Sequence, residues 1–267
     1  MIELYQVLLL ALVQGLTEFL PISSSAHLVI PPLLLGWPDQ GLAFDVAVHV
    51  GTLSAVIIYY RRDLQAMFLA WLRSLGGGQA SDDSRLVWYL CLATVPAGIV
   101  GLVAGDYIEM NLRSLPVIAT TTLVFGVLLG LAQRLGAKAG EGRRLDLPLA
   151  MAIGLAQALA PVPGVSRSGV TITAGLLLGM DRQGAARFSF LLSIPIIASA
   201  GLLKLFDLVA AGDPVDWTSL LIGALVSAFT AYLCIAIFLR LLDRVGLMPF
   251  VYYRIALAVV LYALWLF

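Results

Sequence analysis

Two short polar stretches interrupt an otherwise apolar chain, and they hold most of the residues that could do chemistry at membrane depth. The first runs from Gln14 to His27 and the second from Pro163 to Gly169. Between them they contain a carboxylate, several serine hydroxyls, a histidine and an arginine. Ionisable groups are costly inside a bilayer and usually mark a substrate path or an active site. The search for function therefore begins with these two stretches.

The first stretch combines a carboxylate with hydroxyl groups. Gln14 and Glu18 are four residues apart, so they share one face of a helix, and Pro21 ends that helix. The polar residues that follow are Ser23, Ser24, Ser25 and His27. Glu18 could hold a divalent cation or move a proton. A serine could attack phosphorus if a nearby base accepts its proton.

Each of these residues also has a structural interpretation. Serines beside a proline-broken helix often cap backbone groups. His27 could be the base, could itself become phosphorylated, or could be a hydrogen-bonded core residue. Glu18 is the hardest to explain structurally, because a buried carboxylate needs a partner. Arg167 is the obvious partner, either directly or through a bound metal and phosphate.

The second stretch has the composition of an oxyanion cradle. Gly164 and Gly169 free the backbone, so that amide groups can turn toward a ligand. Ser166 and Ser168 offer hydroxyl donors, and the planar guanidinium of Arg167 matches phosphate or carboxylate oxygens. A helix that starts here would point its positive end at the same anion. The alternative is a break in a membrane helix whose arginine only pairs with a carboxylate.

Two further polar residues, Asp45 and His49, lie one helical turn apart at the start of an apolar segment. Asp45 could cap that helix or help to line the site. We expect His49 to be a packed, hydrogen-bonded residue, and Thr171 and Thr173 to be structural. Arginines and aromatic residues near the segment ends are typical of interfacial anchors.

The elements that must position these residues are membrane helices. Of 267 residues, 61% are hydrophobic and 12% charged, and the mean hydropathy is +0.98. Soluble domains carry roughly 25% charged residues. The net charge of zero suggests no nucleic-acid partner. Cys91 and Cys234 lie in apolar runs, which favours packed thiols over a disulfide framework, and the N-terminus lacks the basic region of a signal peptide.

Apolar segments of two lengths alternate along the chain. Six of them approach the about 20 residues that a spanning helix needs: 42–60, 86–105, 115–133, 186–203, 218–239 and 251–267. Four are too short or too broken to span: 4–20, 28–36, 147–160 and 170–180. Each pair of short pieces flanks one polar stretch. The sequence thus predicts a single membrane domain over residues 1–267, an all-α polytopic protein with six transmembrane helices and two re-entrant helical hairpins. Broken backbone at depth is tolerated where it is buried in protein or lines a wet cavity.

The distribution of charge predicts the orientation. If both hairpins return to the side on which they start, 13 of the 16 basic residues fall on one face. They lie in the expected loops 61–85, 134–146, 181–187 and 240–254. The loops of the other face, 106–114 and 204–217, are mostly acidic. By the positive-inside rule the basic face is cytoplasmic, so both termini and the opening of the site are expected on the outer face.

The two polar stretches align without gaps at an offset of 143 residues, and Ser24 then falls opposite Arg167. The identical pairs include Gln14 with Gln157, Leu16 with Leu159, Ser23 with Ser166, and Ser25 with Ser168. The halves 1–135 and 145–267 each hold one hairpin and three spans, so the second half is inverted. The basic linker 136–144 joins them on the cytoplasmic side. Inverted repeats with broken helices commonly build a site near the midplane, where the two stretches would meet.

Both stretches closely resemble motifs of the undecaprenyl-diphosphate phosphatase family, also called the bacitracin resistance protein family. The matching runs are Glu18-Phe19-Leu20-Pro21 with Ser23-Ser24 and His27, and Pro163-Gly164-Val165-Ser166-Arg167-Ser168-Gly169. Length, motif separation and hydropathy match as well, so the resemblance covers the whole chain. It implies a multi-pass protein of the bacterial inner membrane with six transmembrane helices and two re-entrant helical pairs in an inverted repeat.

The resemblance also implies an activity, which is hydrolysis of undecaprenyl diphosphate to the monophosphate, recycling the carrier lipid of the cell wall. It implies a divalent cation, Mg²⁺ or Ca²⁺, held by Glu18 and Gln14. The implied catalytic residues are Glu18, Ser24, His27 and Arg167, and the expected substrate-binding residues are Gln14, Ser23, Ser25, Gly164, Ser166, Ser168 and Gly169. Two departures are modest. Gln14 stands where some members carry a second carboxylate, and Ser25-Ala26 replaces a more usual Thr-Gly.

One mechanism follows as a hypothesis. Arg167 and backbone amides bind the phosphoryl oxygens and stabilise charge in the transition state. Ser24 attacks while His27 takes its proton, and Glu18 with Gln14 positions the cation. The alternatives are His27 as the nucleophile, or Glu18 activating water directly.

The rival function is a lipid-phosphate flippase or transporter that uses the same midplane site, because a fold does not determine a function. The expected partners are the isoprenoid diphosphate lipid and membrane lipids, with no nucleic acid. A homodimer is left open by the sequence.

Overall fold

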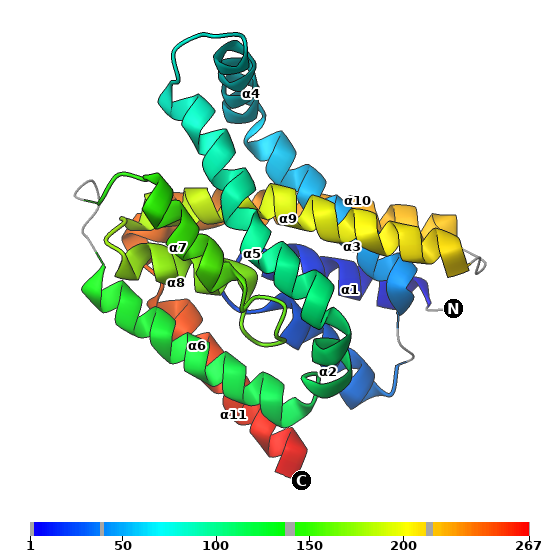
Figure 1. Cartoon of the computed structure of the whole chain (residues 1–267). Coiled ribbons are helices and arrows are strands. Elements are labelled where there is room, and N and C mark those ends of the chain that lie inside the picture. Colours follow the sequence, from blue (N-terminus) through cyan, green and yellow to red (C-terminus); the bar gives the residue numbers. More distant parts are fainter. Residues whose placement is uncertain (1–2, 38–39, 137–141, 212–215, 267) are drawn as a thin grey trace.

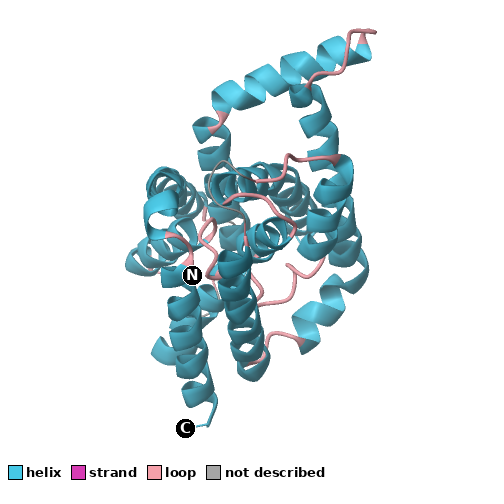
Figure 2. Ribbon diagram, turned by 90° about the vertical axis from the view of Figure 1, so that its left-hand side faces the viewer, coloured by secondary structure: helices cyan, strands magenta, loops and turns pink. Residues whose placement is uncertain are grey.

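The computed structural model describes residues 3–37, 40–136, 142–211 and 216–266, and every regular element in these ranges is an α-helix (Figures 1 and 2). Six of the helices are long and apolar enough to cross a membrane. They are α3 (Gly41–Tyr59), α5 (Asp82–Asn111), α6 (Leu115–Leu135), α9 (Arg182–Ala211), α10 (Trp217–Val245) and α11 (Met248–Leu266). They coincide with the six predicted spans, so the all-α polytopic fold is confirmed.

Four shorter helices bracket the two polar stretches. They are α1 (Leu4–Thr17), α2 (Ser24–Leu35), α7 (Leu147–Gln157) and α8 (Arg167–Leu177). α1 packs against α2 and α7 against α8, so each pair is a helical unit whose central turn carries a polar stretch. Under the 143-residue offset, α1 and α7 begin at equivalent positions, and so do α2 and α8.

The two central turns also share a backbone conformation. Ser23 and Ser166, equivalent under the offset, have φ of 72° and 71° and are the non-glycine residues with positive φ among those described. The Ser23 hydroxyl lies 3.1 Å from that of Ser25, and the Ser166 hydroxyl lies 3.2 Å from that of Ser168. This left-handed conformation costs a non-glycine residue about 1–3 kcal/mol, so the surroundings must hold both turns. The likeness supports the predicted repeat. Its inversion across a membrane stays a prediction, and residues 137–141 of the predicted linker lie outside the described residues.

Residues 61–75 form a helix where we expected a loop. α4 (Arg61–Leu75) begins directly after α3 and lies outside the bundle, beside the start of α5 (Figure 1). Its apolar residues recur at helical spacing, as at Leu64, Met67 and Trp71. The flanking arginines lower the mean hydropathy of the segment, so a search for long apolar runs passes over an amphipathic helix of this length.

The basic segment 240–254 is also mostly helical, which corrects the expectation of a loop there. α10 ends at Val245 and α11 begins at Met248, so only Gly246 and Leu247 connect them. Arg254 lies within α11 and its exposed fraction is 0%. It is therefore not one of the surface charges of the basic face, although the bias toward that face remains without it.

Close approaches between helices leave little freedom around the turns. A Cβ atom added to Gly15 of α1 would lie 2.7 Å from the Ser227 carbonyl oxygen of α10. One added to Gly126 of α6 would lie 2.9 Å from the Arg254 side chain of α11. These glycines let α1 approach α10 and α11 approach α6.

Candidate active site

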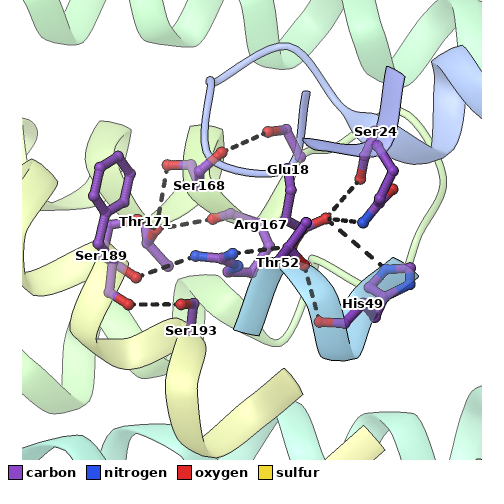
Figure 3. Close-up of polar contacts among 12 residues, drawn as sticks. Glu18, Ser24, His49, Thr52, Arg167, Ser168, Thr171, Ser189 and Ser193 are labelled. Carbon is purple, nitrogen blue, oxygen red and sulfur yellow. Dashed lines mark hydrogen bonds and ion pairs between the residues drawn. The ribbon is translucent and has the colours of Figure 1, made fainter. Parts of the chain in front are cut away.

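Glu18 and Arg167 form an ion pair that joins the two polar turns. Nη2 of Arg167 lies 3.0 Å from Oε1 of Glu18, and the two side chains are only 11% and 8% exposed. Figure 3 shows both at the centre of the polar cluster. The buried carboxylate thus has the partner that the sequence led us to expect. Removing one member of such a pair leaves an uncompensated charge, which is strongly destabilising.

The second oxygen of Glu18 collects the remaining polar groups of the first turn. Oε2 accepts hydrogen bonds from Nε2 of Gln14 and from Oγ of Ser24, each at 3.0 Å. The predicted meeting of Gln14 and Glu18 on one helix face is therefore observed. Ser24 and Arg167, which the repeat sets opposite each other, meet through this carboxylate, one on each oxygen (Figure 3).

His49 of α3 also faces this carboxylate, which we did not expect. Its Nδ1 lies 2.7 Å from the Asp45 carbonyl oxygen, so Nδ1 carries a proton. Its Nε2 lies 3.9 Å from Oε2 of Glu18. A histidine four residues after an aspartate near a helix start is a weak signal, because the same spacing suits local capping. What the sequence could not show is that α3 brings this ring to the first turn.

Arg167 is held from three sides. Its Nη1 donates to the Ser189 carbonyl oxygen of α9 at 3.1 Å, and its guanidinium carbon lies 5.6 Å above the ring of Phe19. Thr171, one turn further along α8, accepts or donates a 2.7 Å hydrogen bond with the Ser189 hydroxyl. Thr171 is structural, as expected. These contacts orient the guanidinium toward Glu18.

The remaining serines of the second turn stabilise its backbone. Oγ of Ser166 accepts a hydrogen bond from the Gly169 amide at 3.1 Å and so caps the first turn of α8. Oγ of Ser168 donates to the Leu20 carbonyl oxygen at 2.9 Å, which ties the second turn to the first. Gly164 has φ of 89°, and a Cβ there would collide with the Thr121 hydroxyl. These residues fix the backbone of the second turn.

Arg254 is the buried residue that the sequence analysis wrongly assigned to the basic surface. Its guanidinium donates to backbone carbonyl oxygens of both turns and of α6 and is completely buried. The acceptors are Pro21 at 3.2 Å, Val165 at 3.2 Å, Gly164 at 2.7 Å and Thr122 at 3.1 Å. Pro21 and Gly164 are equivalent under the 143-residue offset. One signal was available, because position 254 falls inside the predicted apolar span 251–267, where an arginine is costly.

His27 is oriented away from the role we assigned to it. Its Nδ1 donates to the Ser23 carbonyl oxygen at 2.7 Å. Its Nε2 lies 2.6 Å from the Tyr253 hydroxyl, and the two rings stack with an interplanar angle of 6°. Both ring nitrogens are therefore engaged, and the hydroxyl of Ser24 donates to Glu18 instead. This is the hydrogen-bonded arrangement that the sequence left open.

The charges of the cluster favour an anionic ligand. Glu18 and Arg254 are the buried charged residues of the described part of the chain, and Arg167 is nearly buried beside them. Arg167 thus pairs with the one buried carboxylate, and the charge of Arg254 is buried against backbone carbonyl oxygens of both turns. An added phosphate would find both positive charge and preorganised donors, which is the arrangement that binds phosphoryl groups.

The oxygen atoms present suit a divalent cation only in part. Among the described residues there is no group of three His, Cys, Asp or Glu side chains that could hold a metal. Oε1 of Gln14, however, is buried and without a hydrogen-bond partner, beside the Glu18 carboxylate. Mg²⁺ is commonly held by one or two protein oxygens together with substrate phosphates. Gln14 and Glu18 therefore fit a cation that arrives with a diphosphate.

Comparison with known proteins gives this cluster its context. The sequence profile described as Bacitracin resistance protein BacA matches residues 7–260. The Undecaprenyl-diphosphatase of Alcanivorax borkumensis is 57% identical over 96% of this chain and 97% of its own length. That of Teredinibacter turnerae is 55% identical over 97% and 98%, and Undecaprenyl-diphosphatase 1 of Pseudoalteromonas translucida is 52% identical over 96% and 97%. Since these matches span both polar turns and nearly the whole chain, the protein belongs to the bacitracin resistance protein BacA family.

Proposed function

We propose that this protein hydrolyses undecaprenyl diphosphate to undecaprenyl phosphate and phosphate in the bacterial inner membrane. Relatives that carry this name are more than 50% identical over almost the full chain. The observation that carries the chemistry is the shared Glu18 carboxylate, which binds the Ser24 hydroxyl on one oxygen and the Arg167 guanidinium on the other. A nucleophile, a base and a phosphate ligand therefore lie within one cluster.

Ser24 is the proposed nucleophile and Glu18 the proposed base. The Ser24 hydroxyl attacks the terminal phosphorus and passes its proton to Oε2 of Glu18, where it already donates a hydrogen bond. The bond from that phosphorus to the bridging oxygen breaks, and undecaprenyl phosphate leaves. Glu18 gives this proton to the bridging oxygen of the leaving lipid phosphate and is a carboxylate again. Water then attacks the phosphoserine phosphorus and passes a proton to Glu18. The bond from phosphorus to Ser24 Oγ breaks, phosphate leaves, and Glu18 returns the proton to Oγ. This assignment replaces His27 as the base.

Arg167 is the proposed ligand of the transferred phosphoryl group. Its contacts with Ser189 and Phe19 fix the guanidinium on the side of Glu18 that faces the second turn. A fixed donor that meets charge developing in the transition state is worth about 10²–10³-fold in rate. Ser166 and Ser168 hold the cradle in shape through their backbone contacts.

A divalent cation, Mg²⁺ or Ca²⁺, is part of the proposal. Glu18 and the unpartnered Oε1 of Gln14 would hold it. When bound, such an ion neutralises charge on the diphosphate and polarises its oxygens. Removing divalent ions with a chelator should therefore weaken substrate binding.

The orientation in the membrane is also proposed. The arginine-rich ends of the spans lie on the cytoplasmic side by the positive-inside rule, and the termini and the opening of the site lie on the outer side. The leaving lipid phosphate would then remain in the outer leaflet.

Phosphate release from undecaprenyl diphosphate by purified protein in detergent tests the function. Glu18→Gln, Arg167→Ala and Ser24→Ala should each lose activity by about 10²-fold or more. Arg113→Ala, which removes an exposed ion pair with Glu109, is the control and should match the wild type. A chain that releases no phosphate without a gradient would contradict the proposal, and full activity in Ser24→Ala would rule out the serine route. Trapping a phosphoenzyme and locating its phosphate distinguishes Ser24 from His27.

A further inference from the structure

α4 carries an apolar stripe that the rest of the protein does not cover. Its inward side packs through Leu64, Met67 and Trp71, and Met67 is only 3% exposed. The neighbouring face carries large apolar side chains at helical spacing that remain open. They are Phe68 at 55%, Leu69 at 43%, Leu72 at 44% and Leu75 at 58% exposure. Positions 68, 72 and 75 fall on one line along the helix.

This stripe continues onto a membrane-spanning helix. The rings of Trp71 on α4 and Trp88 on α5 lie 6.0 Å apart in an edge-on contact. From Trp88 the exposed apolar residues of α5 follow at helical spacing: Leu92, Val95 and Ile99. α5 is a candidate span, so this row faces lipid. Tryptophans gather where a bilayer meets water, which indicates that α4 lies at the level where lipid contact begins.

Basic residues lie along the other edge of α4. Arg62 and Arg73 are exposed there, and Arg61 precedes them at the helix start. The acidic groups nearby are partly neutralised, because Asp63 pairs with Arg187 at 2.9 Å and Asp82 lies 3.9 Å from Arg85. Asp83 is the remaining carboxylate at the start of α5. Apolar and basic sides on one helix are typical of helices that rest on anionic bilayers.

We propose that α4 is an interfacial helix that binds the bilayer surface, with Phe68, Leu72 and Leu75 in the acyl boundary and Arg62 and Arg73 on anionic phospholipid headgroups. Both views show α4 running across the direction of α5 rather than along it, as an in-plane helix would beside a span (Figures 1 and 2). Arginines near an anionic bilayer surface are attracted to its headgroups.

A lipid surface fits this face better than a second copy of the chain. In an antiparallel two-fold contact through the stripe, the arginine edges of both copies would fall on the same side. Arg62 and Arg73 would then lie near the arginines of the partner, and like charges repel. Anionic headgroups complement the same edge.

An anchored α4 would also hold the start of α9 in place. The Asp63–Arg187 pair joins α4 to the start of α9, and α9 presents the Ser189 carbonyl oxygen to Arg167. Anchoring α4 on the bilayer therefore also anchors the end of the helix that orients this arginine.

Spin labels on opposite sides of α4 test the proposal. In a Cys91→Ala, Cys234→Ala background, one protein carries the label at Leu72 and its matched control carries it at Ala66. Both are placed in lipid nanodiscs with phosphatidylcholine alone or mixed with phosphatidylglycerol. We expect several-fold greater accessibility to oxygen than to a nickel chelate at 72, and the reverse at 66. The anionic lipid should place the label at 72 deeper in the bilayer. Replacing both arginines, Arg62→Gln with Arg73→Gln, should abolish this change in depth.

Three outcomes would overturn the proposal. Nickel accessibility at both positions would place α4 in water. Protection from both reagents at 72, together with a short distance between labels of two chains, would show that a second copy covers the stripe. Oxygen contact at 72 that ignores phosphatidylglycerol would refute the headgroup contacts. Phosphate release by each labelled protein verifies that it is folded.

Discussion

Glu18 is the residue on which both polar turns converge. It accepts hydrogen bonds from Gln14, Ser24 and Arg167. Nε2 of His49 lies 3.9 Å from Oε2 of the same carboxylate. Because one oxygen of Glu18 accepts from Ser24 and the other from Arg167, a phosphate that binds Arg167 would have to exchange with the Glu18 contact. Under the proposed mechanism, the Ser24 hydroxyl is already directed at its proton acceptor.

Some of these residues were predictable and others were not, for physical reasons. An unpaired carboxylate is unfavourable to bury, so the free energy of burial alone led to the pairing of Glu18 with Arg167. The contact of His49 with Glu18 depends on how α3 packs, and no local pattern encodes that. The orientation of His27 depends on Tyr253, which lies 226 residues further along the chain.

Arg254 should be the most sensitive residue outside the reacting cluster. Arg254→Leu removes the donor to four buried carbonyl oxygens, each of which costs about 1–3 kcal/mol when left unpaired. We expect a lower midpoint of thermal unfolding in detergent and a loss of phosphate release. Arg254→Lys should be intermediate, since one ammonium group cannot reach all four acceptors.

Arg244→Gln is the matched control, because Arg244 is exposed in the last turn of α10. It should unfold and react like the wild type. An Arg254→Leu protein with an unchanged midpoint of unfolding would show that the turns hold their shape without the hydrogen bonds of Arg254.

At the scale of the elements, the pattern of long and short apolar pieces was enough to predict the helices. Six spans and four short helices fall where hydropathy and the two polar stretches place them. α4 escaped because its amphipathic pattern has a low mean hydropathy. The positive φ of Ser23 and Ser166 could not be foreseen, since serine has no preference for that region.

Helix packing at Gly51 should be intolerant of a methyl group. A Cβ there would collide with the Ala224 carbonyl oxygen of α10, so Gly51→Ala should cost about 1–3 kcal/mol by overpacking. Gly101→Ala is the control, because nothing lies within 4 Å of a Cβ at that position. Thermal unfolding of the two variants gives the comparison. Equal midpoints would mean that α3 and α10 can move apart at no cost.

Asp146 caps α7 on the basic side of the protein and should make its stability depend on pH. Its carboxylate accepts from Arg143 at 2.6 Å and from the Leu149 amide at 2.9 Å. These contacts hold the pKa of Asp146 below its usual 3.8. A lowered pKa in the folded state stabilises the protein above the unfolded pKa, and the gain is lost as pH falls through the folded pKa.

Asp146→Asn should therefore unfold at a lower temperature than the wild type near neutral pH. The difference should shrink as the pH falls below about 4. A constant difference across that range would show that the cap acts without its charge.

At the scale of the whole molecule, the two halves of the repeat supply different residues to the polar cluster. The first turn supplies Glu18 and Ser24, and the second supplies Arg167 at the position equivalent to Ser24. Neither turn alone holds both the proposed nucleophile and the proposed phosphate ligand. The positions of the helices do not give the orientation of these halves in the membrane. The distribution of basic residues in the sequence does predict it.

Labelling in intact cells tests that orientation. In the Cys91→Ala, Cys234→Ala background, Asn111→Cys at the end of α5 should react with an impermeant maleimide added outside. Gln79→Cys, just before α5 begins, should react only after the cells are opened. The opposite pattern would reverse the topology and place the site opening on the cytoplasmic side.

The contacts of Arg254 have one more consequence, which concerns mutational drift. In the two turns Arg254 donates to the main-chain carbonyl oxygens of Pro21, Val165 and Gly164. Every amino acid supplies such an oxygen. A substitution at Pro21 or Val165 therefore leaves the oxygen that Arg254 binds in place, whereas Gly164 is fixed by its positive φ and by the Thr121 hydroxyl. Sequence change is thus tolerated less at Arg254 than at these two acceptors, and the two turns can carry different side chains on one backbone shape.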